Sequence, residues 1–187
     1  GHLDRAYLAL QGVDLGRVSA QPERFGVNLP ALRAGGVGLA LGTIFTERGS
    51  DDAWGYPADD DGTAAHRAGR AQLDIYERME ASGAIRIVRR RDDLAGIGDG
   101  GPLRVVLLME CADPIRTPDE APWWFERGVR VVGMAWAHGS RFCGGNMQEG
   151  PLTAQGRELV QAFDALGVLH DASHLSRQSF DDLLACT

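Results

Sequence analysis

Histidine and carboxylate side chains recur in this chain where strands are expected to end. Near-continuous apolar runs are typical of parallel strands that are covered on both faces, and the carboxyl ends of such strands meet at one face of a barrel. The residues at these ends are His2 and Asp4 near the amino terminus, Glu110 after 103–109, His138 after 129–137, and His174 after 168–172. Four separate segments therefore deliver His, Asp or Glu to what we expect to be one edge of a sheet.

These residue types are suited to binding a divalent metal ion. Zinc binds neutral imidazole and anionic carboxylate oxygen at about 2 Å. In the pattern His2-x-Asp4 both side chains point to the same side of a strand, so one ion can take both. A buried Glu110 is costly unless a cation or metal compensates its charge. Taken singly, a strand-end histidine or glutamate is more often a structural hydrogen-bond or ion-pair partner, and that alternative stays open.

Apolar strands and amphipathic helices alternate along most of the chain, which predicts an α/β fold with a parallel sheet. The strongest helical pattern covers 63–82, where Ala71, Ile75 and Met79 recur at four-residue spacing. The acidic segment 51–62 is expected to be a solvated surface loop, and the GxGxxG match at 96–101 a turn, because it precedes a strand. The expected strands are 37–45, 85–88, 103–109, 129–137 and 168–172, and the expected helices are 29–32, 63–82, 118–127, 153–166 and 177–185.

Length and composition describe an ordinary globular chain. Its 187 residues suit a single domain, 1–187. Nineteen cations, all of them arginine, stand against 26 acidic residues, and a net charge of −7 argues against nucleic-acid binding. No apolar run approaches the roughly 18 residues of a membrane span. The three cysteines, Cys111, Cys143 and Cys186, form no CxxC pair, which favours free thiols in a reducing, cytoplasmic setting.

Several segments together resemble the renal (membrane) dipeptidase family, the zinc peptidases of family M19, which have amidohydrolase-type barrels. The match covers most of the chain, and the order and spacing of its pieces are more specific than any one piece. The matching segments are LPALRAGGVG at 29–38, QLD at 72–74, GVRVV at 128–132 through His138, LTAQG at 152–156, and GVLHDASHLS at 167–176.

This resemblance implies a (β/α)8 TIM barrel, of which the chain supplies about the first five strands. It also implies hydrolysis of dipeptides by a zinc-activated water, with two zinc ions bridged by Glu110. His2 and Asp4 would bind one zinc and His174 the second. His138 would contact the substrate and stabilise the tetrahedral intermediate. Asp171 would support the site from outside the metal shell, whereas His170 replaces an aliphatic residue and receives no ligand role.

Two departures from the family pattern keep other functions open. The family usually has Glu-Gly-Gly after its third strand, but this chain has Glu110-Cys111-Ala112, and the loop 139–146 also differs. A hydrolase acting on another small amide, an N-acyl amino acid or a lactone is therefore an alternative, and a non-catalytic barrel fragment is another. Cys143 follows His138 by five residues but lacks an arranged base, so we do not expect a nucleophile there.

The family places a further metal-binding histidine on its sixth strand and a catalytic aspartate on its eighth. This sequence reaches Thr187 after the fifth strand and its helix. We therefore expect a continuing or separate segment to supply the remaining half of the barrel, with the chain alone inactive. A dipeptide is the expected small-molecule substrate, and a homodimer is left open.

Overall fold

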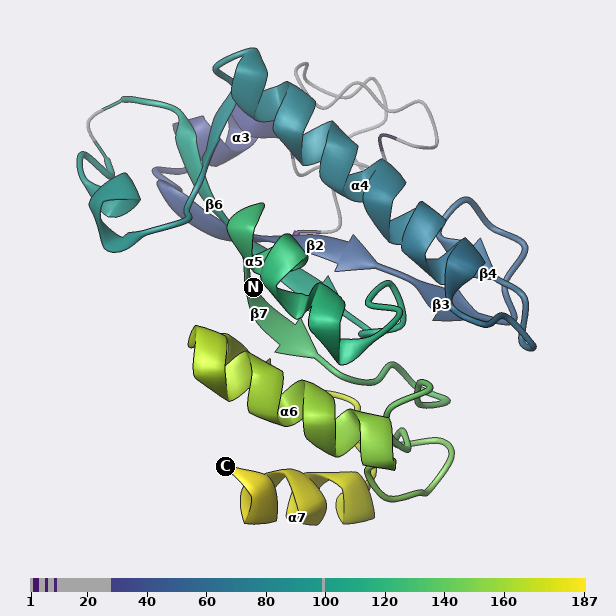
Figure 1. Ribbon diagram of the computed structural model, residues 1–187. Coiled ribbons are helices and arrows are strands. Elements are labelled where there is room, and N and C mark those ends of the chain that lie inside the picture. The colour runs from purple at the N-terminus through teal and green to yellow at the C-terminus, as the bar shows by residue number, and fades with distance from the viewer. Residues whose placement is uncertain (1, 4–5, 7–8, 10–27, 99) are drawn as a thin grey trace.

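The computed structural model describes residues 2–3, 6, 9, 28–98 and 100–187 (Figure 1). A six-stranded parallel sheet has the order β1-β2-β6-β7-β8, and β5 pairs with the part of β6 that precedes its contact with β7. A second, two-stranded sheet is formed by β3 and β4. The strands are β1 (His2–Leu3), β2 (Leu39–Phe45), β3 (Glu47–Arg48), β4 (Gly55–Tyr56), β5 (Ile85–Ile87), β6 (Leu103–Glu110), β7 (Val129–Gly133) and β8 (Leu169–Asp171).

Helices alternate with these strands, as the sequence predicts. α4 packs on β2 and β5, α5 on β7, and α6 on β8, while α6 also lies between α5 and α7 (Figure 1). Asn28, Thr153 and Ser176 cap helices by accepting backbone N–H groups in the first turn. The helices are α3 (Leu29–Ala34), α4 (Thr63–Ala81), α5 (Ala121–Glu126), α6 (Ala154–Leu166) and α7 (Arg177–Cys186), with 3-10 turns η1 (Arg91–Leu94) and η2 (Pro118–Glu120).

The strand expected at 129–137 is shorter than its apolar run. β7 ends at Gly133, which is paired with Glu110, the last residue of β6. Glu110 and Gly133 are the last residues of β6 and β7 that are in register, and beyond them one long hydrogen bond joins the N–H of Ala112 to the carbonyl of Met134 at 3.5 Å. The chain then turns back at Trp136, whose carbonyl accepts the N–H of Gly139 at 2.6 Å. His138 consequently lies in a turn five residues past the strand, not directly at its end.

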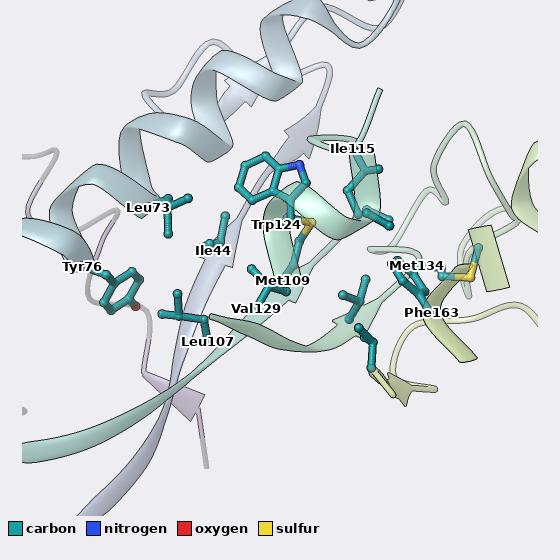
Figure 2. Close-up of a cluster of buried hydrophobic side chains, with 14 of the residues drawn as sticks. Ile44, Leu73, Tyr76, Leu107, Met109, Ile115, Trp124, Val129, Met134 and Phe163 are labelled. Atoms are coloured by element: carbon teal, nitrogen blue, oxygen red, sulfur yellow. The ribbon is translucent and has the colours of Figure 1, made fainter. Parts of the chain in front are cut away.

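The hydrophobic core lies between the sheet and the helices (Figure 2). Burying each of these large side chains contributes roughly 1.5–3 kcal/mol. Gly42 of β2 keeps the two layers close, because a Cβ there would lie 2.5 Å from Cγ1 of Val105 and 2.8 Å from Cε1 of Tyr76. The cluster includes Ile44, Leu107, Met109 and Val129 from the sheet, Leu73 and Tyr76 from α4, Trp124 from α5, and Phe163 from α6.

The opposite face of the sheet carries the residues of interest. The strand register aligns Phe45 with Glu110, Glu110 with Gly133, and Gly133 with Asp171. Since residues in register share a face, these four form one layer across four strands at the carboxyl edge. Nearer the amino edge, Leu169 is 65% exposed on this face. On the same face Thr43 and Leu108 are buried, so exposure is confined to the end near β8.

The amino edge of the sheet is closed by the segment 91–102. The guanidinium of Arg104, 7% exposed, donates hydrogen bonds to the carbonyl oxygens of Asp93 at 2.9 Å, Pro102 at 2.7 Å and Ala95 at 2.5 Å. These contacts hold the glycine-rich turn against β6. The turn precedes the strand, as predicted.

The acidic loop before α4 is largely exposed, as expected for 51–62, and one of its carboxylates also caps the helix. The carboxylate of Asp60 accepts the N–H groups of Gly62 at 3.1 Å and of Ala64 and Ala65 at 3.0 Å. These are among the N–H groups that have no partner within a helix, so Asp60 satisfies the start of α4. The loop thereby fixes the beginning of the longest helix.

Candidate metal centre

Glu110 and His174 meet at the carboxyl edge of the sheet. Glu110 ends β6, with its side chain 11% exposed, and His174 follows β8 by three residues. Nε2 of His174 lies 3.0 Å from Oε1 of Glu110. The structure thus brings together two of the predicted metal ligands, which are 64 positions apart in the printed sequence.

The backbone of His174 is held in an unusual conformation. Its φ is 65°, in the left-handed region that non-glycine residues rarely adopt. The loop after β7 supports it: the N–H of Asn146 donates to the carbonyl of His174 at 2.8 Å, and Gly145 forms a β-bridge with Leu175. Strained backbone of this kind persists only where the surroundings hold it, and it concentrates at functional sites.

An aromatic wall stands beside the pair. The ring of Trp136 stacks on the imidazole of His174, with centroids 5.6 Å apart and an interplanar angle of 27°. Phe45, aligned with Glu110 in the sheet, meets Trp136 edge-on at 5.6 Å and 61°. Sequence reasoning missed Trp136, although its position at the end of the apolar run 129–137 was the available signal.

Asp171 faces the same side of the sheet as Glu110. The residue between them in register is Gly133, whose missing side chain leaves the space open: a Cβ there would lie 3.8 Å from Oδ2 of Asp171. Oδ1 of Asp171 accepts the N–H of Ser173 at 2.9 Å. Asp171 thus shapes the short turn that leads to His174.

The other predicted site residues have different placements. The backbone of His2 is in β1, aligned with Leu41, but its side chain and the whole of Asp4 lie outside the described residues. His138 is exposed in the turn after β7, and within 28–98 and 100–187 no hydrogen bond or ion pair joins it to Glu110 or His174. His170 is in register with Val132 and packs away from the site, with Nε2 2.8 Å from Oδ1 of Asp164.

A buried polar cluster supports the strand end behind Glu110. Cys111 has a φ of 72°, the conformation that explains a glycine at this position in the resembling family. Its Sγ lies 3.7 Å from the hydroxyl of Tyr56, and that hydroxyl also donates to Asp113. Asp113 in turn accepts the backbone N–H of Arg141 at 2.9 Å and its Nε at 3.3 Å. The cluster ties β4, the end of β6 and the loop after β7 together.

Burial controls the titration of these groups. Removal from water, reinforced by the charge of Asp113, raises the pKa of the Cys111 thiol and of the Tyr56 phenol above their ordinary values. Burial also raises the pKa of the Cys143 thiol to about 12. Neither thiol is therefore a thiolate at neutral pH, and a cysteine nucleophile at Cys143 has no support.

The donor set at Glu110 and His174 fits a divalent metal ion. Imidazole nitrogen and carboxylate oxygen are both zinc ligands. In a tetrahedral site, ligand atoms about 2.0–2.2 Å from the ion stand roughly 3.3–3.6 Å apart. The Nε2–Oε1 distance of 3.0 Å is shorter than this and is that of a hydrogen-bonded ion pair. In the part of the chain that the structure describes, no group of three or more His, Cys, Asp or Glu side chains gathers closely enough to hold an ion. This chain's described residues thus offer two ligands at this point.

Surface hollows lie at the other end of the sheet. One of about 420 Å³ is lined by Glu80, Arg89 and neighbouring residues of β5, and one of about 160 Å³ lies between Arg33 and Gly101. Both adjoin the amino ends of the strands, where Arg104 closes the sheet. Glu110 and His174 lie at the carboxyl edge, so neither hollow is part of the candidate site.

The class of fold is an α/β fold with a parallel sheet, which carries Glu110 and His174 at its carboxyl edge, the edge where barrels of this kind assemble their sites. The family model described as "Membrane dipeptidase (Peptidase family M19)" matches residues 1–187, and the chain belongs to that family. The fold class and family predicted from the sequence are confirmed.

Known relatives agree with this assignment. Dipeptidase tcpJ of Claviceps purpurea is 27% identical over 98% of this chain and 44% of its own length. The crystal structure of dipeptidase AC, an M19 metallopeptidase, has a TM-score of 0.79 at 22% identity, over 100% of this chain and 59% of that one. A metallopeptidase from Rhodobacter sphaeroides, liganded with a phosphinate mimic of the dipeptide L-Ala-D-Ala, has a TM-score of 0.78 at 19% identity, over 100% and 61%.

The chain spans 38% and 44% of the two curated relatives it matches. The activity named for Dipeptidase tcpJ therefore belongs to a longer protein. No described helix is both long and apolar enough to cross a membrane.

Proposed function

We propose that this chain supplies part of the metal centre of a zinc-dependent dipeptidase, and that residues 1–187 are one domain, the amino-terminal part of a TIM barrel. The observation that carries the proposal is the 3.0 Å approach of His174 Nε2 to Glu110 Oε1 at the carboxyl edge of a parallel sheet. A dipeptide substrate is supported by family membership and by the dipeptide mimic held by the Rhodobacter sphaeroides relative.

Each residue has a distinct role in this proposal. Glu110 would hold both zinc ions, His174 would bind the second, and His2 and Asp4 would bind the first. When bound, zinc polarises the scissile carbonyl and lowers the pKa of water to roughly 7. Glu110, nearly buried, keeps negative charge beside the ions in a setting where electrostatic interactions are strong.

The protein's own groups orient the substrate. His138, exposed in the turn at the same edge of the sheet, donates a hydrogen bond to the oxygen on which negative charge develops during hydrolysis. Phe45 and Trp136 form an apolar wall next to His174. A wall of this kind limits access of bulk water to one side of the metal ligand.

Elemental analysis of the full-length protein after exhaustive dialysis tests the metal centre. We expect about two zinc equivalents in the wild type. Glu110→Ala and the isosteric Glu110→Gln should lose most of them. Glu80→Ala is the matched control, because Glu80 pairs with Arg89 at the opposite end of the sheet and its loss should leave the metal content unchanged. Full zinc retention in both Glu110 variants would remove the bridging role.

His138→Ala separates substrate contact from metal binding. It should keep its zinc and hydrolyse dipeptides roughly 10²-fold more slowly, as expected for loss of an oxyanion donor. Zinc loss in proportion to activity would instead make His138 a ligand, and an unchanged rate would exclude both roles.

A second candidate keeps the metal centre and changes the substrate. Cys111 stands where the family pattern has glycine, and the loop 139–146 departs from that pattern beside His138. These differences favour a hydrolase of N-acyl amino acids, lactones or other small amides. A substrate panel decides between the candidates by the highest kcat/KM, and a protein without bound zinc or hydrolysis would leave only a non-catalytic barrel.

A further inference from the structure

His174 lacks the usual means of fixing the orientation of a metal-binding histidine. Such a histidine normally holds its second ring nitrogen in a hydrogen bond to a carboxylate or carbonyl. Nε2 of His174 faces Glu110, but no residue in the described ranges hydrogen-bonds to its Nδ1. The side chain is also 32% exposed, so close packing on all sides does not restrain it.

The flat face of Trp136 occupies the position beside this ring. The two rings are stacked at 5.6 Å and 27°, and Trp136 is itself held edge-on by Phe45. The backbone of both residues is also held by hydrogen bonds. The carbonyl of Trp136 accepts the N–H of Gly139, and the carbonyl of His174 accepts the N–H of Asn146. These contacts hold the indole of Trp136 in one orientation beside the imidazole of His174.

We propose that Trp136 is the positioning residue of the metal centre: its indole sets the plane of the His174 imidazole so that Nε2 points at the ion shared with Glu110. This inference rests on the proposed function, because it presupposes that His174 binds a metal. Trp136 acts through His174 and needs no contact with the ion.

Two variants of the full-length protein separate stacking from simple packing. Trp136→Phe keeps a flat ring, whereas Trp136→Leu keeps apolar bulk without one. Zinc affinity is measured by competition with a fluorescent chelator. We expect Trp136→Leu to bind zinc about 10-fold more weakly or worse, the range seen when a group that orients a ligand is removed. Trp136→Phe should stay well within that factor.

A second readout needs neither zinc nor activity. In the metal-free wild type, the ring protons of His174 should show the upfield NMR shift that an aromatic face imposes. The shift should persist in Trp136→Phe and vanish in Trp136→Leu. Its absence from the wild type would overturn the proposal even if Trp136→Leu failed to fold.

The outcomes also separate this inference from the proposed function. Wild-type zinc affinity in Trp136→Leu would overturn the positioning role while leaving the metal centre intact. Equal loss in Trp136→Phe and Trp136→Leu would assign Trp136 to packing alone and would also overturn it. If the wild type shows the stacking shift but binds no zinc, the proposed function is refuted, and the positioning role is refuted with it.

Discussion

At the scale of single residues, burial keeps two thiols near the candidate site, Cys111 and Cys143, in their neutral form. Glu110 is nearly buried, yet His174 lies within 3.0 Å of its carboxylate. At Cys111, its neighbour in sequence, burial and then the negative charge of Asp113 raise the pKa of the thiol and disfavour a thiolate. Two neighbouring residues therefore differ in their surroundings: the carboxylate of Glu110 faces an imidazole, whereas the thiol of Cys111 faces the carboxylate of Asp113.

This contrast predicts the pattern of thiol alkylation. Iodoacetamide at pH 8 should label Cys186, which is half-buried, but not Cys111 or Cys143, whose pKa values are raised by burial. Mass spectrometry should find one modified thiol in the native chain and all three cysteines modified in denaturant. Cys186→Ser is the control and should show none in the native state. Rapid native labelling of Cys143 would contradict the burial argument.

At the scale of elements, β6 organises both ends of the sheet. Its second residue, Arg104, anchors the segment 91–102 at the amino edge, and its last residue, Glu110, carries the candidate chemistry. Within that segment, Asp93 accepts Nε of Arg86 at 3.2 Å and the N–H groups of Arg89 and Arg90 at 3.0 Å. These contacts start η1 and lower the pKa of Asp93 to about 2, with the Arg86 hydrogen bond as the largest cause.

The lowered pKa of Asp93 predicts a pH-dependent contribution to stability. A carboxyl group whose folded-state pKa lies below its ordinary 3.8 stabilises the fold above that value and loses this effect as pH falls toward 2. Asp93→Asn should cost about 1 kcal/mol at pH 7, discounted because Arg86 is half-exposed. Urea unfolding should show a smaller difference from wild type at pH 3.

Asp92→Asn is the matched control for this measurement. Asp92 is exposed beside Asp93, and no hydrogen bond or ion pair of its side chain occurs among the described residues. Its substitution should leave stability nearly unchanged at both pH values. The same gap between Asp93→Asn and wild type at pH 7 and pH 3 would refute the ionic explanation.

At the scale of the whole molecule, one hydrophobic cluster runs through the described chain. It includes Ala6, Leu29 of α3 and Leu183 of α7, and every long helix contributes to it. A contiguous core of this kind is the usual basis for cooperative unfolding of a single domain.

We therefore predict one unfolding transition. Far-UV circular dichroism and tryptophan fluorescence should give coincident urea curves. Leu107→Ala, which removes a fully buried side chain of β6, should shift both curves together and cost about 2–5 kcal/mol. Val37→Ala, at a 37% exposed position before β2, is the control with a much smaller effect. Separated transitions would indicate two independently folding parts.

The sequence by itself determined the family, the α/β class and the order of elements. Apolar runs such as 103–109 and the periodic pattern of 63–82 are local signals, because burial on both faces of a strand or one face of a helix dictates which residues occur. It also singled out Glu110 and His174 from their positions after such runs. The metal-binding and catalytic roles of all five predicted site residues, His2, Asp4, Glu110, His138 and His174, remain predictions.

Only the tertiary structure decided how these residues meet. The end of β7 depends on how far its register with β6 continues, which is a non-local property, and His138 lies in a turn beyond that end. The stacking of Trp136 on His174 and the left-handed backbone of Cys111 and His174 likewise depend on loops from different strands. Contacts between segments that are distant in sequence produce no periodic pattern of residues. The stacking of Trp136 on His174 could therefore be found only from the three-dimensional structure.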